Sequence, residues 1–158
     1  MPTPKTFTAQ NAVNEVFQTD PNGNVYVYRF GDQSTAWDWL SRKRQAANGN
    51  FPQPAPNDLN DWALKQSSYG SESEGIANNP FISVATDYES LYANGEGWVQ
   101  KILQTVPTLG VFLVPAASLY RPSPTKSISK METEWLYYDG GAPINNYIQQ
   151  WRANPKRV

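Results

Sequence analysis

The chain of 158 residues contains neither cysteine nor histidine. The missing cysteines exclude disulfide bonds, thiol catalysis and Cys-ligated zinc. They leave the compartment open, because a secreted domain of this size can fold without disulfides. The missing histidines exclude the usual base of a catalytic triad and the commonest metal ligand, so we expect no metal. Any catalysis must therefore use carboxylates, Arg, Lys, Tyr, Ser or backbone groups.

The chain also lacks a long apolar run and an excess of basic residues. No apolar stretch reaches the length of about 18 residues that a membrane helix needs, so we expect no membrane partner. The start, "MPTPKTFTAQ", has no charged segment followed by an apolar one, which is not typical of a signal peptide and leaves the delivery route open. The net charge of −1 provides no general basic field for a phosphate backbone, so we expect no nucleic-acid partner.

Apolar and aromatic residues, by contrast, are plentiful. Hydrophobic residues make up 39% of the chain and aromatic residues 13%, including six Trp and nine Tyr. This content is enough for a packed core and argues against global disorder. Together with the length, it predicts a single domain over residues 1–158, in which residues 1–24 form a polar N-terminal extension.

The hydrophobic patterns predict a mixed α+β fold. Strands are predicted where apolar and aromatic residues alternate or form short runs, at residues 25–30, 81–86, 109–115 and 131–138. Helices are predicted after capping residues, at residues 34–49, 57–67 and 87–95. In the first of these helices, Trp37, Leu40 and Arg44 are expected to share one face. Residues 97–106 and 143–152 fit either a helix or a strand.

Three of the predicted strands carry residues suited to binding or catalysis. Arg29 ends the first strand, in "VYRFGD", and Ser83 lies within the second, "FISVAT". The segment "KMETEWLYYDG" carries Glu132 and Glu134, which share a strand face because side chains two residues apart point the same way. Taken singly, these residues also fit ordinary roles. The glutamates fit a solvated strand edge, Arg29 fits a pairing with Asp32, and the serine fits a backbone contact.

The order of these motifs resembles the Arg–Ser–Glu pattern of mono-ADP-ribosyltransferases related to the A chains of cholera toxin and heat-labile enterotoxin. The resemblance covers residues 25–150. "VYRFGD" is similar to the family's Tyr-Arg-x-Asp, with one extra residue before Asp32. "LGVFLVP" followed by "ETEWLYYDGGAP" is similar to the family's apolar strand, Glu-x-Glu pair and Gly-Gly turn before a proline. Of the family's Ser-Thr-Ser, the chain keeps only the first serine, Ser83.

The resemblance implies a split two-sheet α+β core, with a central cleft for NAD and flanking helices. It implies an enzyme, a toxin or effector, that transfers ADP-ribose from its substrate NAD to a protein acceptor. It also implies secretion or delivery into a target cell, with a delivery or activating partner. A glutamate two residues before the catalytic one favours arginine as the acceptor.

Within this resemblance, the two glutamates are the catalytic residues. Glu134 would face the oxocarbenium-like ribose and hydrogen-bond a ribose hydroxyl. Glu132 would position the acceptor guanidinium and accept its proton, and two adjacent carboxylates should couple in their titration. Nicotinamide leaves as a neutral molecule from a cationic bond, so a site without histidine is chemically sufficient.

Four further residues are expected to contact NAD or to order the site. Arg29 would hold the pyrophosphate through its guanidinium fork, and Ser83 would hold Arg29 and Glu134 in place. Asp32 and Phe81 complete the expected contacts. Phe81 is one of four aromatic candidates for stacking on nicotinamide, and the others are Tyr88, Tyr92 and Trp98.

Three other functions remain open. An NAD glycohydrolase would use water in place of the acceptor. A transferase of related fold would modify guanine or nucleic acid, which the low basicity disfavours. An interaction module on the same fold would have lost turnover together with the Ser-Thr-Ser motif.

Overall fold

The computed structural model describes residues 21–50, 79–94, 97–120 and 134–158. The helix predicted at residues 57–67 and the position of Glu132 lie outside this part of the chain. Within it, a six-stranded antiparallel sheet with few helices confirms the predicted α+β class. No helix among the described residues has the length and apolar character that a membrane crossing requires.

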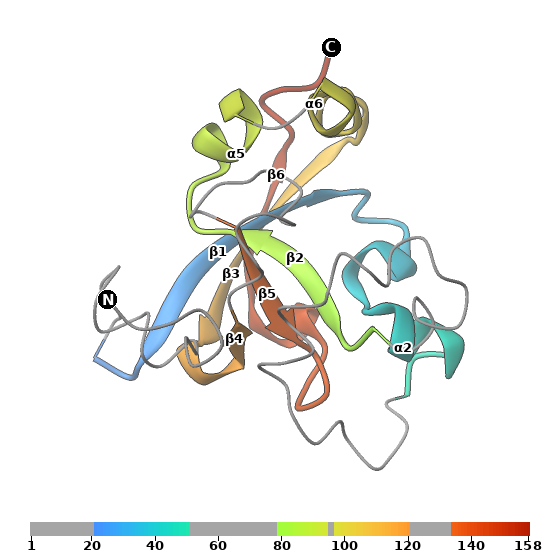
Figure 1. The fold of residues 1–158 in the computed structure, drawn as a ribbon, viewed down its shortest axis with the longest axis vertical. Helices are drawn as coiled ribbons and strands as arrows, with labels where there is room; N and C mark the ends of the chain where they lie inside the picture. The colour runs from blue at the N-terminus through green and yellow to red at the C-terminus, as the bar shows by residue number, and fades with distance from the viewer. Residues whose placement is uncertain (1–20, 51–78, 95–96, 121–133) are drawn as a thin grey trace.

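Strands and short helices follow one another along the chain (Figure 1). The strands are β1 (Asn24–Gly31), β2 (Phe81–Ala85), β3 (Thr108–Pro115), β4 (Leu119–Tyr120), β5 (Glu134–Tyr138) and β6 (Ile148–Ala153). The helices are α2 (Arg42–Ala46), α5 (Tyr88–Asn94) and α6 (Gly97–Thr105), and the 3-10 turns are η2 (Ala36–Trp39), η4 (Ala116–Ser118) and η5 (Ile144–Tyr147). Figure 1 shows α5 and α6 together at the top of the sheet and α2 to the right of β2.

Most strand predictions are confirmed. Residues 25–30, 81–86 and 109–115 correspond to β1, β2 and β3, and the described part of residues 131–138 is β5. The ambiguous residues 97–106 form the helix α6, whereas residues 143–152 contain both η5 and most of β6.

The sheet has the strand order β4-β5-β2-β1-β3-β6 and nearly divides in its middle. β1 pairs with β3 along its whole length, from Asn24–Pro115 to Gly31–Thr108. β2 likewise pairs with β5 from Phe81–Tyr138 to Ala85–Glu134. Between these halves, β1 and β2 share the single partner pair Tyr28–Ala85. We call this point, where β1 and β2 part, the junction.

The main core packs against one face of the sheet. In β1, Val25 and Val27 are buried while the intervening Tyr26 is 52% exposed, as the alternation of a half-buried strand requires. The same cluster takes side chains from four other strands and from η2, η4 and η5; its largest members are Trp39, Phe112, Trp135 and Tyr137. A smaller cluster joins Ala85 of β2 to Leu103 of α6, and this contact explains why residues 97–106 form a helix with one apolar face.

The prediction of a continuous helix at residues 34–49 is wrong, because the structure has η2 and α2 there. Leu40 and Ser41 are extended and separate η2 from α2. The Ser41 hydroxyl accepts a hydrogen bond from Arg44 N at 3.2 Å, which makes Ser41 the N-cap of α2. A side chain from a distant part of the chain, described below, holds Ser41 in this position.

The break also changes which side chains face inward. Trp37, predicted to be inward, is 47% exposed, whereas Trp39 is fully buried. Arg44 is buried. The one-face prediction is therefore wrong for Trp37, because the extended residues rotate η2 relative to α2.

Candidate functional site

Arg29 lies at the junction and bridges β1 to β2. Its Nη1 donates a hydrogen bond of 2.7 Å to the backbone carbonyl of Ser83, 54 residues away in the sequence. Its Nε donates a hydrogen bond of 2.8 Å to the backbone carbonyl of Asp38. The guanidinium therefore holds together two strands that share no further ladder pair.

Arg29 is a cation that forms no ion pair within the described part of the chain, although the Asp38 carboxylate acts on its charge. Burial lowers the pKa of Arg29 to about 10, the Asp38 carboxylate opposes this shift, and Arg42 adds to it. The side chain therefore stays protonated at neutral pH. Both of its hydrogen bonds go to carbonyl oxygens. The ion pairs among the described residues join Arg44 to Asp139 and Lys156 to Glu89, so none of them involves Arg29. A desolvated guanidinium in this state favours an anion beside it.

The turn after β1 fixes the Asp38 carbonyl beside Arg29. Trp39 Nε1 donates to the Asp32 carbonyl at 2.9 Å, and Asp32 N donates to Asp38 Oδ2 at 2.8 Å. Gly31 lies directly under the Trp39 ring, since a Cβ built there would come within 2.9 Å of it. Because only glycine permits this approach, the sequence "FGDQSTAWDW" folds back on the end of β1.

Three of the predicted residues meet at the junction through their backbone positions. Ser83 contacts Arg29 through its carbonyl oxygen. β5 begins at Glu134, whose backbone pairs with Ala85, two residues beyond Ser83. β1, β2 and β5 are thus neighbours in the sheet, and the roles of the three residues in a common site stay predictions.

Asp32 and Phe81 are engaged in local contacts. Asp32 Oδ1 accepts hydrogen bonds from the hydroxyl and the backbone N–H of Ser34, and these bonds lower the pKa of Asp32. Phe81 is only 3% exposed, with its ring centroid 5.7 Å from that of Tyr120. Their roles as NAD contacts stay predictions.

The other aromatic candidates differ in their surroundings. Tyr88 packs edge-on against Tyr28 and Phe30, with ring centroids 5.2 and 6.0 Å apart. Tyr92 lies beneath the Lys156 ammonium, which is 5.0 Å from its ring centroid. Trp98 is 53% exposed on α6.

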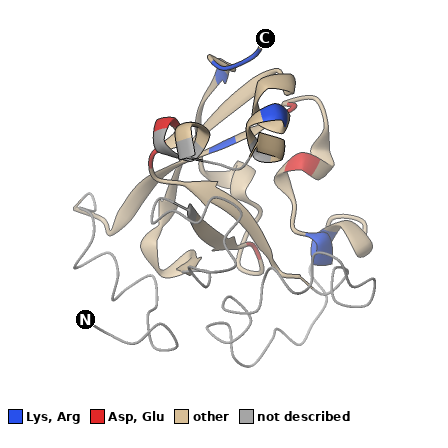
Figure 2. Ribbon diagram, turned by 45° about the horizontal axis from the view of Figure 1, so that its top comes forward, with Lys and Arg blue, Asp and Glu red and all other residues tan. Residues whose placement is uncertain are grey.

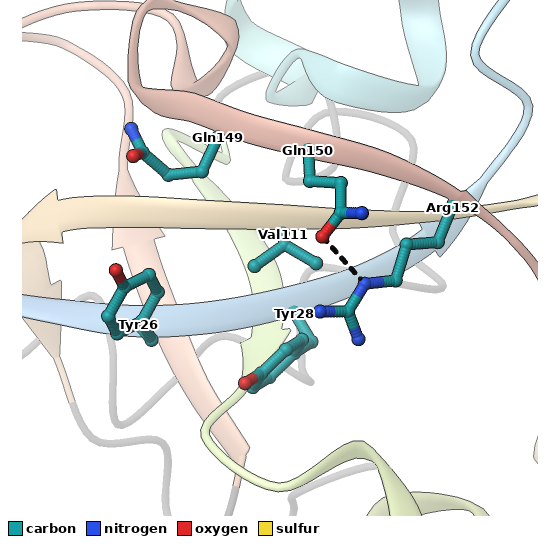
Figure 3. Close-up of a pocket in the computed structure, with 6 residues that line it drawn as sticks. All are labelled: Tyr26, Tyr28, Val111, Gln149, Gln150 and Arg152. Atoms are coloured by element: carbon teal, nitrogen blue, oxygen red, sulfur yellow. Dashed lines mark hydrogen bonds between the residues drawn. The ribbon is translucent and has the colours of Figure 1, made fainter.

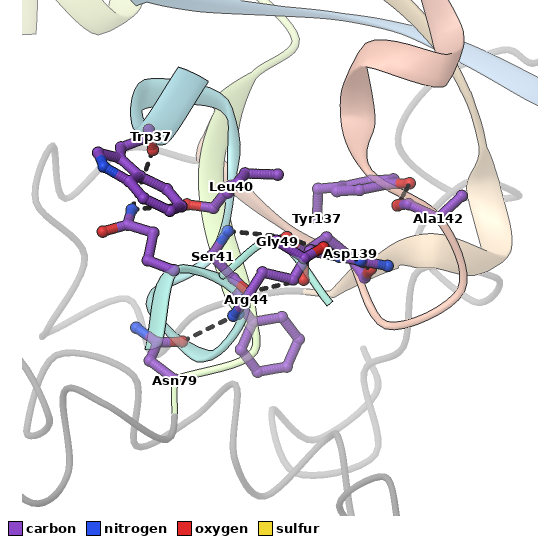
Figure 4. A network of polar contacts seen from close by, with 11 residues as sticks. Trp37, Leu40, Ser41, Arg44, Gly49, Asn79, Tyr137, Asp139 and Ala142 are labelled. Atoms are coloured by element: carbon purple, nitrogen blue, oxygen red, sulfur yellow. Dashed lines mark hydrogen bonds and ion pairs between the residues drawn. The ribbon is translucent and has the colours of Figure 1, made fainter. Parts of the chain in front are cut away.

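Another arginine, Arg44, is buried and belongs to a polar network that no sequence motif predicted (Figure 4). Asp139, fully buried at the end of β5, accepts hydrogen bonds of 2.7 Å from both the backbone N–H and the hydroxyl of Ser41. Arg44 Nε donates to the Asp139 carbonyl at 2.9 Å, and its Nη1 donates to the Gly49 carbonyl at 2.8 Å. Arg44 Nε also lies 3.6 Å from Asp139 Oδ2, within ion-pair distance.

This network determines where α2 begins. Burial raises the pKa of the Asp139 carboxyl, while the Ser41 hydrogen bonds and Arg44 oppose the shift. Ser41 and Asp139 are separated by 98 residues. In the sequence, the only sign of this network is the aspartate of "YYDGG", whose pattern is typical of a turn.

A hollow of about 560 Å³ lies on the open face of β1, β3 and β6 (Figure 3). It is lined by Tyr26, Tyr28, Val111, Gln149, Gln150 and Arg152. None of the described residues that line it is a predicted site residue. Register pairs nevertheless connect it to the junction, because Glu134, Ala85, Tyr28, Val111 and Gln150 form one row across five strands.

The junction has one element of an anion site. Arg29 supplies a cation, and the two carbonyl hydrogen bonds restrict its rotation. The backbone of Glu134 lies two strands away from β1, in β5. A guanidinium fixed in this way can bind a phosphate group.

Comparison of the chain with protein-family models, with curated protein sequences and with solved structures found no significant match.

Proposed function

We propose that the protein is a mono-ADP-ribosyltransferase that transfers ADP-ribose from NAD to arginine on a protein acceptor. The observation that carries this proposal is the hydrogen bond from Arg29 Nη1 to the Ser83 carbonyl, at the junction where β5 begins at Glu134. Three motifs from distant parts of the chain thereby converge, in the order that the family resemblance requires. The near-division of the sheet at the single pair Tyr28–Ala85 supports a split core of the kind expected for this family.

In the proposed reaction, Arg29 binds the pyrophosphate of NAD. It forms no ion pair with any carboxylate of the described residues, and a guanidinium matches phosphate oxygens through parallel hydrogen bonds. Breaking the bond between nicotinamide and ribose leaves positive charge on the ribose, and the Glu134 carboxylate stabilises it. Glu132 orients the acceptor guanidinium, takes its proton and directs its nitrogen to the anomeric carbon.

The decisive experiment measures nicotinamide release and label transfer from adenylate-labelled NAD to agmatine. The wild-type protein should do both. Glu134→Gln keeps the side-chain size and removes the charge, so both rates should fall by about a thousandfold, as for the loss of a main electrostatic stabiliser. Glu132→Gln should lose transfer to agmatine while still releasing nicotinamide.

Glu89→Gln is the matched control, because Glu89 is an exposed carboxylate on α5 that pairs with Lys156. Its activity should equal that of the wild type, and circular dichroism should show that all three variants are folded. Full activity in a folded Glu134→Gln variant would reject the proposal. Nicotinamide release without any transfer, in the wild type, would replace it with the glycohydrolase.

A further inference from the structure

The hollow on β1, β3 and β6 is a separate concave site of ligand size. Its volume of about 560 Å³ falls within the range of roughly 300–1,000 Å³ that is usual for small-molecule pockets. Figure 3 shows Tyr26 and Tyr28 on one side and Gln150 and Arg152 on the other. Its lining comes from strands that pair continuously, so the walls are held by the sheet.

The polar groups around the hollow are mostly unused hydrogen-bond donors. Arg152 Nε donates to Gln150 Oε1 at 2.8 Å, which fixes the guanidinium against the glutamine. The two terminal nitrogens of Arg152 have no partner in the described part of the chain, and neither do the hydroxyls of Tyr26 and Tyr28. The amide oxygen of Gln150 accepts the hydrogen bond from Arg152, and its amide nitrogen can still donate one.

Among the described residues that line the hollow, Arg152 is the only charged one, and it is a cation. The other Lys and Arg residues drawn in Figure 2 are spread over separate elements, among them the helices and the C-terminal end. The positive charge of the hollow therefore comes from Arg152, beside two tyrosine rings.

We infer that this hollow binds an anionic ligand that carries a flat ring, of the class of a nucleoside monophosphate. One guanidinium fork suits one phosphate group, and the Gln150 amide and the tyrosine hydroxyls supply further donors. The exposed face of Tyr26, which is 52% exposed, provides an apolar surface for the ring. This inference rests on the hollow alone and does not depend on the proposed function.

The hollow borders the junction, because Tyr28 lines the hollow and also pairs with Ala85 at the junction. Glu134 lies two strands away from Tyr28 in the same register row, so about 10 Å separates their backbones. Neither Arg29 nor Ser83 lines the hollow. A nucleotide bound at Arg152 should therefore be independent of the Arg29 side chain.

The test is calorimetric titration of the protein with 5′-AMP, inorganic phosphate and adenosine in separate experiments. AMP should bind more tightly than either fragment, because only AMP offers both the anion and the ring. Arg152→Gln should weaken AMP binding by about tenfold or more, as expected for the loss of a charge-assisted pair. Tyr26→Ala should weaken the binding of AMP and adenosine but not that of phosphate.

A control separates this site from general charge effects. Lys101→Gln removes an exposed cation from α6, away from the hollow, and should leave AMP affinity unchanged. The inference is overturned if AMP binds no more tightly than adenosine, if Arg152→Gln binds AMP like the wild type, or if Lys101→Gln weakens AMP binding as much as Arg152→Gln does.

Discussion

Two arginines, Arg29 and Arg44, are held in similar ways but differ in their charge balance. Each donates from Nε and Nη1 to two backbone carbonyls, at distances between 2.7 and 2.9 Å. Arg44 also lies 3.6 Å from the buried carboxylate of Asp139. Arg29 has two carbonyl acceptors and no ion pair among the described residues.

This difference in charge balance indicates that Arg44 has a structural role, whereas Arg29 is the arginine that we propose to bind a ligand. Around Arg44, the carboxylate and the Ser41 donors complete a closed network that connects α2 to the end of β5. At Arg29, carbonyl dipoles fix the orientation of the guanidinium without neutralising it. A partly buried cation that forms no ion pair among the described residues can bind an anion, which is the role that we propose for Arg29.

The largest effect should come from exchanging the two arginines for lysine in separate variants. Arg29→Lys keeps the charge but cannot bridge Asp38 and Ser83 with a planar fork, so NAD turnover should fall by about a thousandfold. Arg44→Lys should lower the free energy of unfolding while leaving turnover close to that of the wild type. The measurements are kcat/KM for NAD and urea unfolding of both variants.

The comparison fails if the two variants behave alike. Equal losses of turnover at equal stability would mean that Arg44 serves the site as directly as Arg29. Wild-type turnover in Arg29→Lys would show that Arg29 has no role in binding NAD, whatever the stability of this variant.

A smaller effect is expected when Asp139 is removed from the network. Asp139→Ala leaves Arg44 without its carboxylate and leaves the buried Ser41 N–H without an acceptor. The free energy of unfolding should fall by about 3 kcal/mol, which is usual when one partner of a buried pair is deleted. Urea denaturation followed by tryptophan fluorescence measures this loss. A change no larger than that of an exposed carboxylate variant, such as Glu89→Gln, would show that the network contributes little.

The smallest effect concerns pH. Because burial raises the folded-state pKa of Asp139 above the ordinary value of 3.8, the folded protein binds a proton more tightly at this group than the unfolded chain does. Its contribution to stability is present below pH 3.8 and is lost as the pH rises through the folded-state pKa. Asp139→Asn cannot titrate, so the stability of the wild type relative to this variant should decrease with rising pH in that window. A difference that is constant, or that increases with pH, would contradict the raised pKa.

The strands of this protein could be predicted because their patterns are local. "VYVYRF" alternates, which matches β1 with one open face. "LGVFLVP" is apolar throughout, which matches β3, an interior strand between β1 and β6 that is mostly buried. The helix at residues 34–49 could not be predicted correctly, because its break at Ser41 depends on Asp139, 98 residues later. Helix propensity favours a continuous helix there. The buried Asp139 carboxylate overrides this preference because it accepts a hydrogen bond from the Ser41 N–H.

The candidate functional residues likewise include some that a local sequence motif indicates and others that only the tertiary structure brings together. The order Arg29, Ser83, Glu134 is visible in the sequence as three short motifs, and their role in a common site stays a prediction. The hollow at Arg152 was not predicted, since its residues are ordinary strand positions until β1, β3 and β6 are placed in register.

By itself, the sequence determined the absence of Cys and His chemistry, the α+β class and the apolar and charged residues available to each strand. Only the tertiary structure decided which arginine is neutralised by an ion pair, where α2 begins and which side chains surround the hollow. The physical reason is that hydrophobic alternation acts over a few residues, whereas ion pairing, capping by a distant carboxylate and strand register join groups tens of residues apart.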